Sequence, residues 1–389
     1  MKYFAMILAA LLTGVATYGQ QAEKNTDFAF RLYSHMKSMP GNIIISPNSI
    51  SEAMAMVYPG ANGTTKDQIA TTMGFDANLK THLKNFKNIN KELTDLSSIE
   101  LYRANSIWLE NTYSPKKCFL KNDQKTFGAS VYKTDFMNSA NQSRLEINKW
   151  VEDKTKTRIK DLLPEGSIDG STRMVLVNSI YFYGEWEKSF DPKMTVSEPF
   201  NSPNKEITTK FLHAKEDYLY SKTDDYSMVE LPFKGNDVVL LALLPNENEG
   251  MNGLEAKLSP EFLQQATAGL HSIKIDLKLP KIKLETESVR IDQQLADMGM
   301  PLAFSSQANF SGISKNNDLR IDKVFHKAFL EFSEKGAEAA AATAVVMVRT
   351  AVNPSKEIRF WANRPFIFFI WDKEHNIILF MGRIETPNA

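Results

Sequence analysis

The chain has 389 residues, of which 43% are hydrophobic, and this is enough to bury a large core. Lysine plus arginine and aspartate plus glutamate each number 46, so the formal net charge is +0. A chain this balanced has no overall attraction to nucleic acid, and no segment after the N-terminal one is long and apolar enough to span a membrane. We therefore predict neither nucleic-acid binding nor a membrane span.

The N-terminal residues have the pattern of a targeting segment. Lys2 supplies a positive charge, residues 4–15 are mostly apolar, and small residues lead to Gly19. This is typical of a signal peptide, so we predict that residues 1–19 are removed and that residues 20–389 form one domain, secreted to an extracellular or periplasmic space. The lone cysteine, Cys118, excludes an intramolecular disulfide.

The first third of the chain is predicted to be mostly helical. Apolar residues recur at helical spacing over residues 28–36, 65–72 and 145–155. A further helix is predicted to begin at Ser46, because its hydroxyl group can accept from the free N–H groups of a first turn and Ile50, Ala53, Met54 and Val57 follow at helical spacing.

Strand patterns begin later and dominate the rest of the chain. Residues 174–182 are almost continuously apolar, which is typical of a strand buried on both faces. Other predicted strands cover residues 101–109, 228–232, 238–244 and 273–284, and residues 366–371 and 377–382 form a predicted hairpin. Helices first and strands later favour an α+β fold over a doubly wound one.

Motifs of enzyme chemistry are absent from the sequence. There is no dinucleotide fingerprint, phosphate loop, His-Glu-x-x-His, Cys-x-x-Cys or Gly-x-Ser-x-Gly pattern, and the six histidines have no metal-ligand spacing. We therefore predict no catalytic residue, no metal site and no cofactor, and we do not expect the chain to be an enzyme.

One segment, residues 331–348, admits two interpretations. Alanine favours a helix capped by Ser333, but the valines that follow favour a strand, and no apolar face recurs at helical spacing. The alternative is a segment that changes from an exposed loop to a buried strand, for which small side chains are suited. With a period of two, Ala337, Ala339 and Ala341 would face inward while Glu338 faces solvent, and Gly336 supplies a hinge.

The alanine-rich segment resembles the hinge of the inhibitory serpins. The matching residues are Glu334, Gly336, Ala337, Glu338, Ala339, Ala340, Ala341 and Ala342, with alanine at 337 where the family usually has threonine or serine. Residues 42–50, 60–65, 177–186 and 324–328 resemble other serpin motifs in the family's order, so the resemblance extends from about residue 25 to the end. It implies an α+β serpin fold with three β-sheets, a large central sheet and an exposed reactive-centre loop at about 336–356.

The resemblance also implies a function and its residues. An inhibitory serpin is a suicide substrate: a protease cuts the loop, and the freed end inserts into the central sheet and traps the acyl-enzyme. Family spacing predicts the reactive bond Thr350–Ala351, or Arg349–Thr350 if the count slips by one. The approach to this bond is Val345, Val346, Met347 and Val348.

The two possible bonds imply different targets among trypsin-like, elastase-like and subtilisin-like endopeptidases, with some cysteine proteases in range. Buried polar residues Ser46, Ser49, Asn178 and His326 match the family's shutter, and Trp186 matches its breach. We expect a monomer that is capable of loop–sheet polymers. A non-inhibitory serpin that serves as a carrier remains the alternative.

Overall fold

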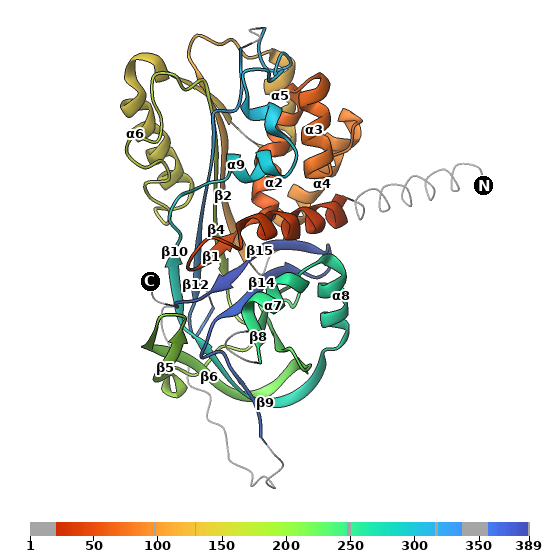
Figure 1. Ribbon diagram of the computed structural model, residues 1–389, viewed down its shortest axis with the longest axis vertical. Coiled ribbons are helices and arrows are strands. Elements are labelled where there is room, and N and C mark those ends of the chain that lie inside the picture. Colours follow the sequence, from red (N-terminus) through yellow and green to blue (C-terminus); the bar gives the residue numbers. More distant parts are fainter. Residues whose placement is uncertain are drawn as a thin grey trace, which may run out of the picture.

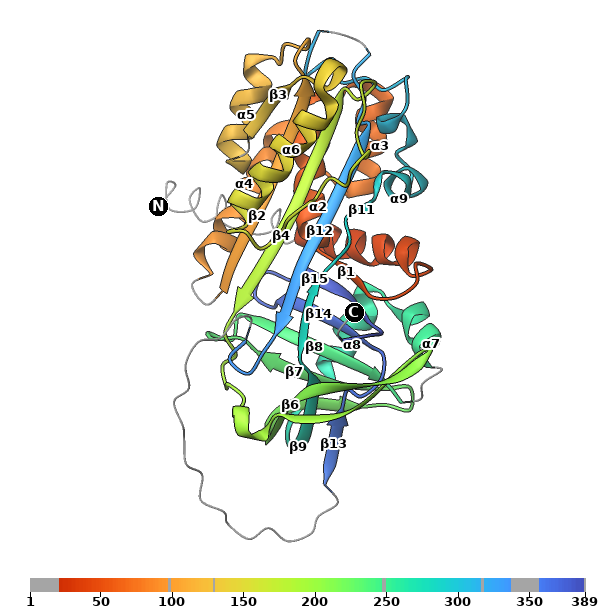
Figure 2. The ribbon, with the colours of Figure 1, turned by 90° about the vertical axis from the view of Figure 1, so that its left-hand side faces the viewer.

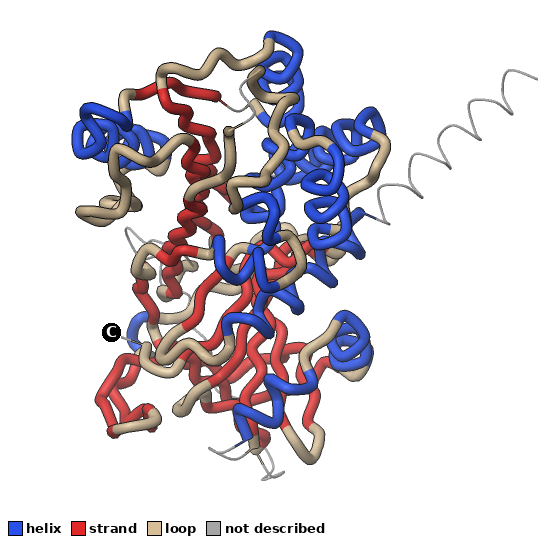
Figure 3. The backbone as a smooth tube through the Cα atoms, turned by 45° about the horizontal axis from the view of Figure 1, so that its top comes forward, coloured by secondary structure: helices blue, strands red, loops and turns tan. Residues whose placement is uncertain are grey.

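Most of the helices gather at one end of an elongated molecule, and the other end is mainly strands (Figures 1 and 3). The computed structural model describes residues 21–96, 99–128, 130–246, 250–315, 318–336 and 357–387. Residues 21–36 are helical, and the other helices are α2 (Pro47–Val57), α3 (Gly63–Met73), α4 (Leu79–Asp95), α5 (Lys117–Phe127), α6 (Phe136–Lys154), α7 (Gly250–Lys257), α8 (Pro260–Ala268) and α9 (Asp292–Asp297). The short 3₁₀ helices are η1 (Tyr58–Gly60), η2 (Pro192–Met194) and η3 (Pro301–Phe304).

The strands form two hydrogen-bonded sheets. A six-stranded sheet has the order β10-β12-β4-β2-β3, with β11 also pairing β12; its strands are β2 (Ile99–Glu110), β3 (Ser130–Thr134), β4 (Met174–Gly184), β10 (Ile282–Glu285), β11 (Val289–Arg290) and β12 (Lys323–Phe332). A nine-stranded sheet has the order β1-β15-β14-β8-β7-β6-β9-β13, with β5 also pairing β6. Its strands are β1 (Ile43–Ile45), β5 (Val196–Ser202), β6 (Lys205–Lys222), β7 (Tyr226–Pro232), β8 (Val238–Pro245), β9 (His271–Pro280), β13 (Ile358–Trp361), β14 (Phe366–Asp372) and β15 (Ile377–Ile384).

The predicted α+β class is confirmed, and within the described residues two of the three predicted sheets are joined by hydrogen bonds into one. Strand β6 is long enough to pair with β5 along its first half and with β7 at its end, so hydrogen bonds join what would be two sheets. The single strand predicted over residues 273–284 is also divided. It breaks between β9 and β10, which belong to different sheets.

Helix α2 begins where the sequence predicts and lies inside the molecule. The Ser46 side chain accepts a hydrogen bond from the Ser49 N–H at 3.4 Å, and Pro47 occupies the first turn, where its missing N–H costs nothing. Every residue of α2 is buried, which its alanines and methionines allow. The helix packs against β2 and β4 of the six-stranded sheet and against β15 of the nine-stranded sheet.

The two faces of β4 contact different layers, as Figure 2 shows, with α6 lying across one of them. Val175 and Val177 face α6 and pack in the same cluster as its Ile147 and Val151. The intervening residues face α2, and Leu176 packs in the cluster that contains the α2 side chains. The prediction of a strand buried on both faces is confirmed, and it places Asn178 on the α2 side.

Candidate functional site

Strands β4 and β12 are direct neighbours and run parallel, and in Figure 2 they lie side by side down the middle of the molecule. Their register pairs Val175 with Lys323 and continues to Tyr181 with Phe329. Among the described residues no strand lies between them. Because β4 and β12 run in the same direction, a strand placed between them would have the same orientation relative to both, and a strand that runs against them would be antiparallel to both.

The predicted shutter residues come together on the α2 side of this strand pair. The Asn178 side-chain amide donates to the Ser49 carbonyl oxygen at 2.8 Å and to the Ser49 hydroxyl oxygen at 2.6 Å. His326 lies opposite Asn178 in the register, and its Nδ1 is 2.5 Å from the Asn178 side-chain oxygen. The Ser46 N–H donates to His326 Nε2 at 3.2 Å. We call Ser46, Ser49, Asn178 and His326 the shutter cluster.

The hydrogen bonds of His326 determine its tautomer. Nε2 accepts from a backbone N–H, so the ring proton is on Nδ1 and is donated to Asn178. Burial lowers the pKa of His326 to about 3, so the ring is neutral at physiological pH. The cluster is thus uncharged, and it links β4, β12 and α2.

A second set of polar residues extends this cluster, and the sequence analysis missed it. The Asn105 side-chain oxygen, on β2, accepts from the Asn178 amide at 2.6 Å, and the Asn105 amide donates to Glu52 Oε2 at 2.8 Å. Arg103 donates to Glu52 Oε2 at 3.1 Å and to the Asn90 side-chain oxygen at 2.6 Å. The signal for this extension was Arg103 and Asn105 at alternate positions of a strand, which places both side chains on one face.

The predicted breach residue, Trp186, is fully buried and holds the end of β12. Its indole N–H donates to the Ser333 carbonyl oxygen at 2.8 Å, and its backbone N–H donates to the Lys335 carbonyl oxygen at 2.9 Å. The indole ring also stacks on Phe233 at 4.6 Å between ring centroids. This tryptophan is the core aromatic that we predicted, and its two hydrogen bonds also fix the backbone at residues 333–335, where the chain leaves β12.

The described part of the predicted hinge is a tight turn. The Gly336 N–H donates to the Ser333 carbonyl oxygen at 3.1 Å, and the Ser333 N–H donates to the Gly336 carbonyl oxygen at 2.8 Å. Gly336 has φ +127, and an added Cβ would lie 2.0 Å from the Gly184 carbonyl oxygen. Only glycine fits here, because the conformation and the close contact both exclude a side chain.

Glu334, a residue of the predicted hinge, is bound by Lys281, between β9 and β10, and by Thr195, just before β5. Lys281 Nζ donates to its two carboxylate oxygens at 2.8 and 3.0 Å, and the Thr195 hydroxyl donates at 2.9 Å. Burial opposes ionisation of Glu334, but these hydrogen bonds outweigh it and lower its pKa. Glu334 is therefore ionised and anchored at neutral pH.

The other predicted site residues lie outside the described residues. They are Ala337, Glu338, Ala339, Ala340, Ala341, Ala342, Val345, Val346, Met347, Val348, Arg349, Thr350 and Ala351, together with the predicted signal peptide, 1–19. Within the described ranges no group of three His, Cys, Asp or Glu side chains is placed to hold a metal ion. No helix in those ranges is long and apolar enough to cross a membrane.

Comparisons with known proteins agree with this geometry. A family model described as "Serpin (serine protease inhibitor)" matches residues 23–387. Serpin B4 of Homo sapiens is 38% identical, with 94% of this chain and 99% of the relative covered. The leukocyte elastase inhibitor of Sus scrofa is 37% identical, with 95% and 100% covered. The structure of human thyroxine-binding globulin complexed with thyroxine superposes with a TM-score of 0.88 at 28% identity, covering 96% of this chain and 100% of that one.

Proposed function

The chain belongs to the serpin family, and from that premise we propose that it inhibits endopeptidases as a suicide substrate. One observation carries the proposal: β12 leads through the Gly336 turn into a segment of small residues, and β12 lies parallel to and directly beside β4. A cleaved segment that folds back at Gly336 would enter between these strands antiparallel to both. In this proposal the chain performs no catalysis of its own.

The length of the segment suits this movement. Residues 337–350, when extended, would span about 46 Å at about 3.3 Å per residue. Strand β4, Met174–Gly184, needs only about 36 Å by the same rise. A protease held as an acyl-enzyme on Thr350 would therefore be carried from one end of the six-stranded sheet to beyond its opposite end.

Insertion requires the shutter cluster to open. Asn178 and His326 are linked across β4 and β12 by a 2.5 Å contact, and an entering strand must separate them. The neutral state of His326 makes this separation less costly than breaking a buried ion pair. The new strand would then form hydrogen-bond ladders on both sides, which supplies the driving force.

The proposed reactive bond is Thr350–Ala351, with Arg349–Thr350 as the alternative register. A cut after Arg349 would suit trypsin-like proteases, and a cut after Thr350 would suit elastase-like or subtilisin-like ones. We also propose that the chain is secreted, on the pattern of residues 1–19, and that residues 20–389 act as one domain. Because the loop of one copy could enter the sheet of another, warming is expected to produce loop–sheet polymers.

The non-inhibitory alternative has one observation in its favour. The similar thyroxine-binding globulin structure is a complex with thyroxine, so a protein of this fold can also bind a small molecule. The residues of the predicted hinge distinguish an inhibitor from a carrier. Small uncharged residues at 337, 339 and 341 permit insertion, whereas a carrier has no need of them.

The test is a denaturing gel after brief incubation of the purified chain with trypsin, elastase or subtilisin. We expect a band at the summed mass that survives boiling in detergent, and mass spectrometry of the released C-terminal peptide then identifies the reactive bond. Ala341→Arg, which places a charge on the inward face, should abolish this band while cleavage continues. Ala340→Arg, on the outward face, is the matched control and should retain it. Clean cleavage of the unmodified chain with no such band would overturn the inhibitory proposal.

A further inference from the structure

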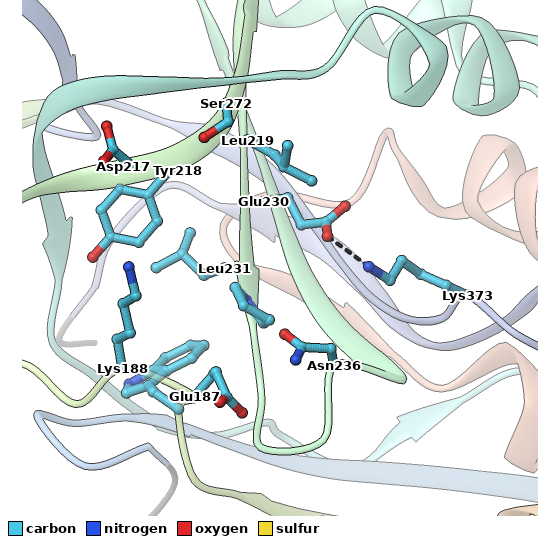
Figure 4. Close-up of a pocket in the computed structure, with 12 residues that line it drawn as sticks. Glu187, Lys188, Asp217, Tyr218, Leu219, Glu230, Leu231, Asn236, Ser272 and Lys373 are labelled. Carbon is cyan, nitrogen blue, oxygen red and sulfur yellow. Dashed lines mark hydrogen bonds and ion pairs between the residues drawn. The ribbon is translucent and has the colours of Figure 1, made fainter.

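A cavity of about 330 Å³ is lined in part by Trp186, and Figure 4 shows the other residues around it. Its apolar lining includes Trp186, Tyr218 and Leu231, all of which are otherwise buried. Volumes of this size, apolar with a few polar groups, are typical of small-molecule sites. Nothing in the sequence patterns pointed to this cavity, because its walls come from β6, β7 and the chain after β4.

Of the five charged residues that line the cavity, three have partners among the described residues, and one of these, Glu187, accepts from the Gly235 N–H at 3.1 Å. Glu230 and Lys373 form an ion pair of 2.8 Å on one side, drawn as a dashed line in Figure 4, and so satisfy each other. Lys188 and Asp217 also line the cavity, and within the described residues neither side chain makes a hydrogen bond or an ion pair. In Figure 4 the Lys188 ammonium group points towards Tyr218, and Asp217 lies on the other side of that ring.

The arrangement of these charges limits the ligand. A simple anion would be attracted by Lys188 but repelled by Asp217, and a simple cation would meet the opposite conflict. A molecule with both charges can satisfy both side chains through charge-assisted hydrogen bonds, while its apolar part covers Leu231 and Tyr218. The volume suits one amino acid better than a long peptide.

We propose that this cavity binds a small zwitterion with an apolar body, of the class of the apolar amino acids. The carboxylate pairs with Lys188, the ammonium group pairs with Asp217, and the side chain lies on the apolar floor. Of the described residues of the shutter cluster, the hinge turn and the breach, only Trp186 lines this cavity.

The shared tryptophan gives the ligand a route to the hinge. Trp186 lines the cavity and donates its indole N–H to the Ser333 carbonyl oxygen, next to Glu334. A ligand that binds the native chain stabilises that state by mass action, and so resists any movement that displaces Trp186. Slower loop insertion in the presence of ligand follows from this only if the proposed inhibitory function holds.

Binding is tested without a protease, by isothermal titration calorimetry of the full chain with L-phenylalanine. Two analogues isolate the charges, since 3-phenylpropionate lacks the ammonium group and 2-phenylethylamine lacks the carboxylate. We expect one L-phenylalanine per chain with a Kd of about 1 mM or lower, and each analogue about tenfold weaker. Equal affinities for the three probes, or no heat with L-phenylalanine at about 10 mM, would overturn the proposal.

Variants of the two exposed charged residues test the assigned contacts. Lys188→Gln should remove the preference for L-phenylalanine over 2-phenylethylamine, and Asp217→Asn should remove the preference over 3-phenylpropionate. Lys193→Gln, at an exposed lysine outside the cavity, is the matched control and should change neither ratio. If Lys188→Gln keeps the full preference, the assignment is wrong. Because no protease enters the assay, failure of the inhibitory proposal would leave these results unchanged.

Discussion

Asp123 provides a direct test of how burial limits the stability of this chain. The residue lies on α5, its side chain is 0% exposed, and neither carboxylate oxygen has a hydrogen-bond partner among the described residues. Burial raises the pKa of its carboxyl group from 3.8 to about 8. Asp123→Asn keeps the shape of the side chain and removes the titrating proton.

The pH dependence has a definite sign. Below pH 3.8 the carboxyl group is protonated in both the folded and the unfolded chain, so it imposes no ionic cost. As pH rises towards 8, the unfolded chain loses the proton and the folded chain keeps it, so the free energy of unfolding falls by about 1.4 kcal/mol per pH unit. At pH 7 the loss is about 4 kcal/mol, a large fraction of the stability of a typical domain.

Urea unfolding of the parent chain and of Asp123→Asn between about pH 5 and pH 8 measures this effect. We expect the variant to be more stable by about 4 kcal/mol at pH 7, with the difference shrinking steadily as the pH falls. Asp224→Asn, at an exposed aspartate, is the control and should show no such trend. A difference that does not change with pH would refute the reasoning, because only titration of a buried carboxyl group predicts the slope.

Three further predictions concern the polar contacts around the sheet. Arg103→Met leaves Glu52, which is 4% exposed, without its cation, so the free energy of unfolding in urea should fall by about 3 kcal/mol. Adding Glu52→Gln to the same chain should restore most of this loss. A loss that is not restored would contradict the ion-pair explanation. Lys281→Met should cost about 1 kcal/mol at neutral pH, because the pair with Glu334 is partly exposed. Since the pKa of Glu334 is lowered in the folded chain, its contribution to the free energy of unfolding is present above pH 4.5 and is lost as the pH falls through the lowered value. Urea midpoints measured across this pH range should show the loss in the parent chain and not in Lys281→Met. Gly336→Val should lower the free energy of unfolding by about 2 kcal/mol, because φ +127 and the Gly184 carbonyl oxygen exclude a side chain. It should also speed hydrogen exchange of the backbone amides that bond to the turn, and unchanged exchange would contradict this explanation.

Several elements follow from local sequence patterns alone. The start of α2 at Ser46 was predicted from a capping side chain, and the burial of β4 on both faces from an unbroken apolar run. The C-terminal hairpin, now β14 and β15, was predicted from two apolar runs around a polar turn. Caps, periodicity and turns act within a few residues, so one chain segment carries all the information that they need.

The site was only partly predictable. The resemblance to serpins predicted a buried polar cluster of Ser46, Ser49, Asn178 and His326. The structure places His326 Nδ1 2.5 Å from the Asn178 side-chain oxygen. The resemblance did not identify Asn105 or Glu52, whose polar side chains complete the same network. A polar residue in an apolar strand signals a partner, but the identity of that partner depends on which strands pair and in which register.

Tertiary structure alone decided the features on which the proposals rest. The sequence predicted strands at 174–182 and 101–109, yet only the assembled sheet shows that β12 lies parallel beside β4 with no strand between them among the described residues. The same holds for the cavity in which Lys188 and Asp217 meet Trp186. Residues far apart in the chain meet because hydrophobic burial selects one packing of many strands, and no local pattern encodes that choice.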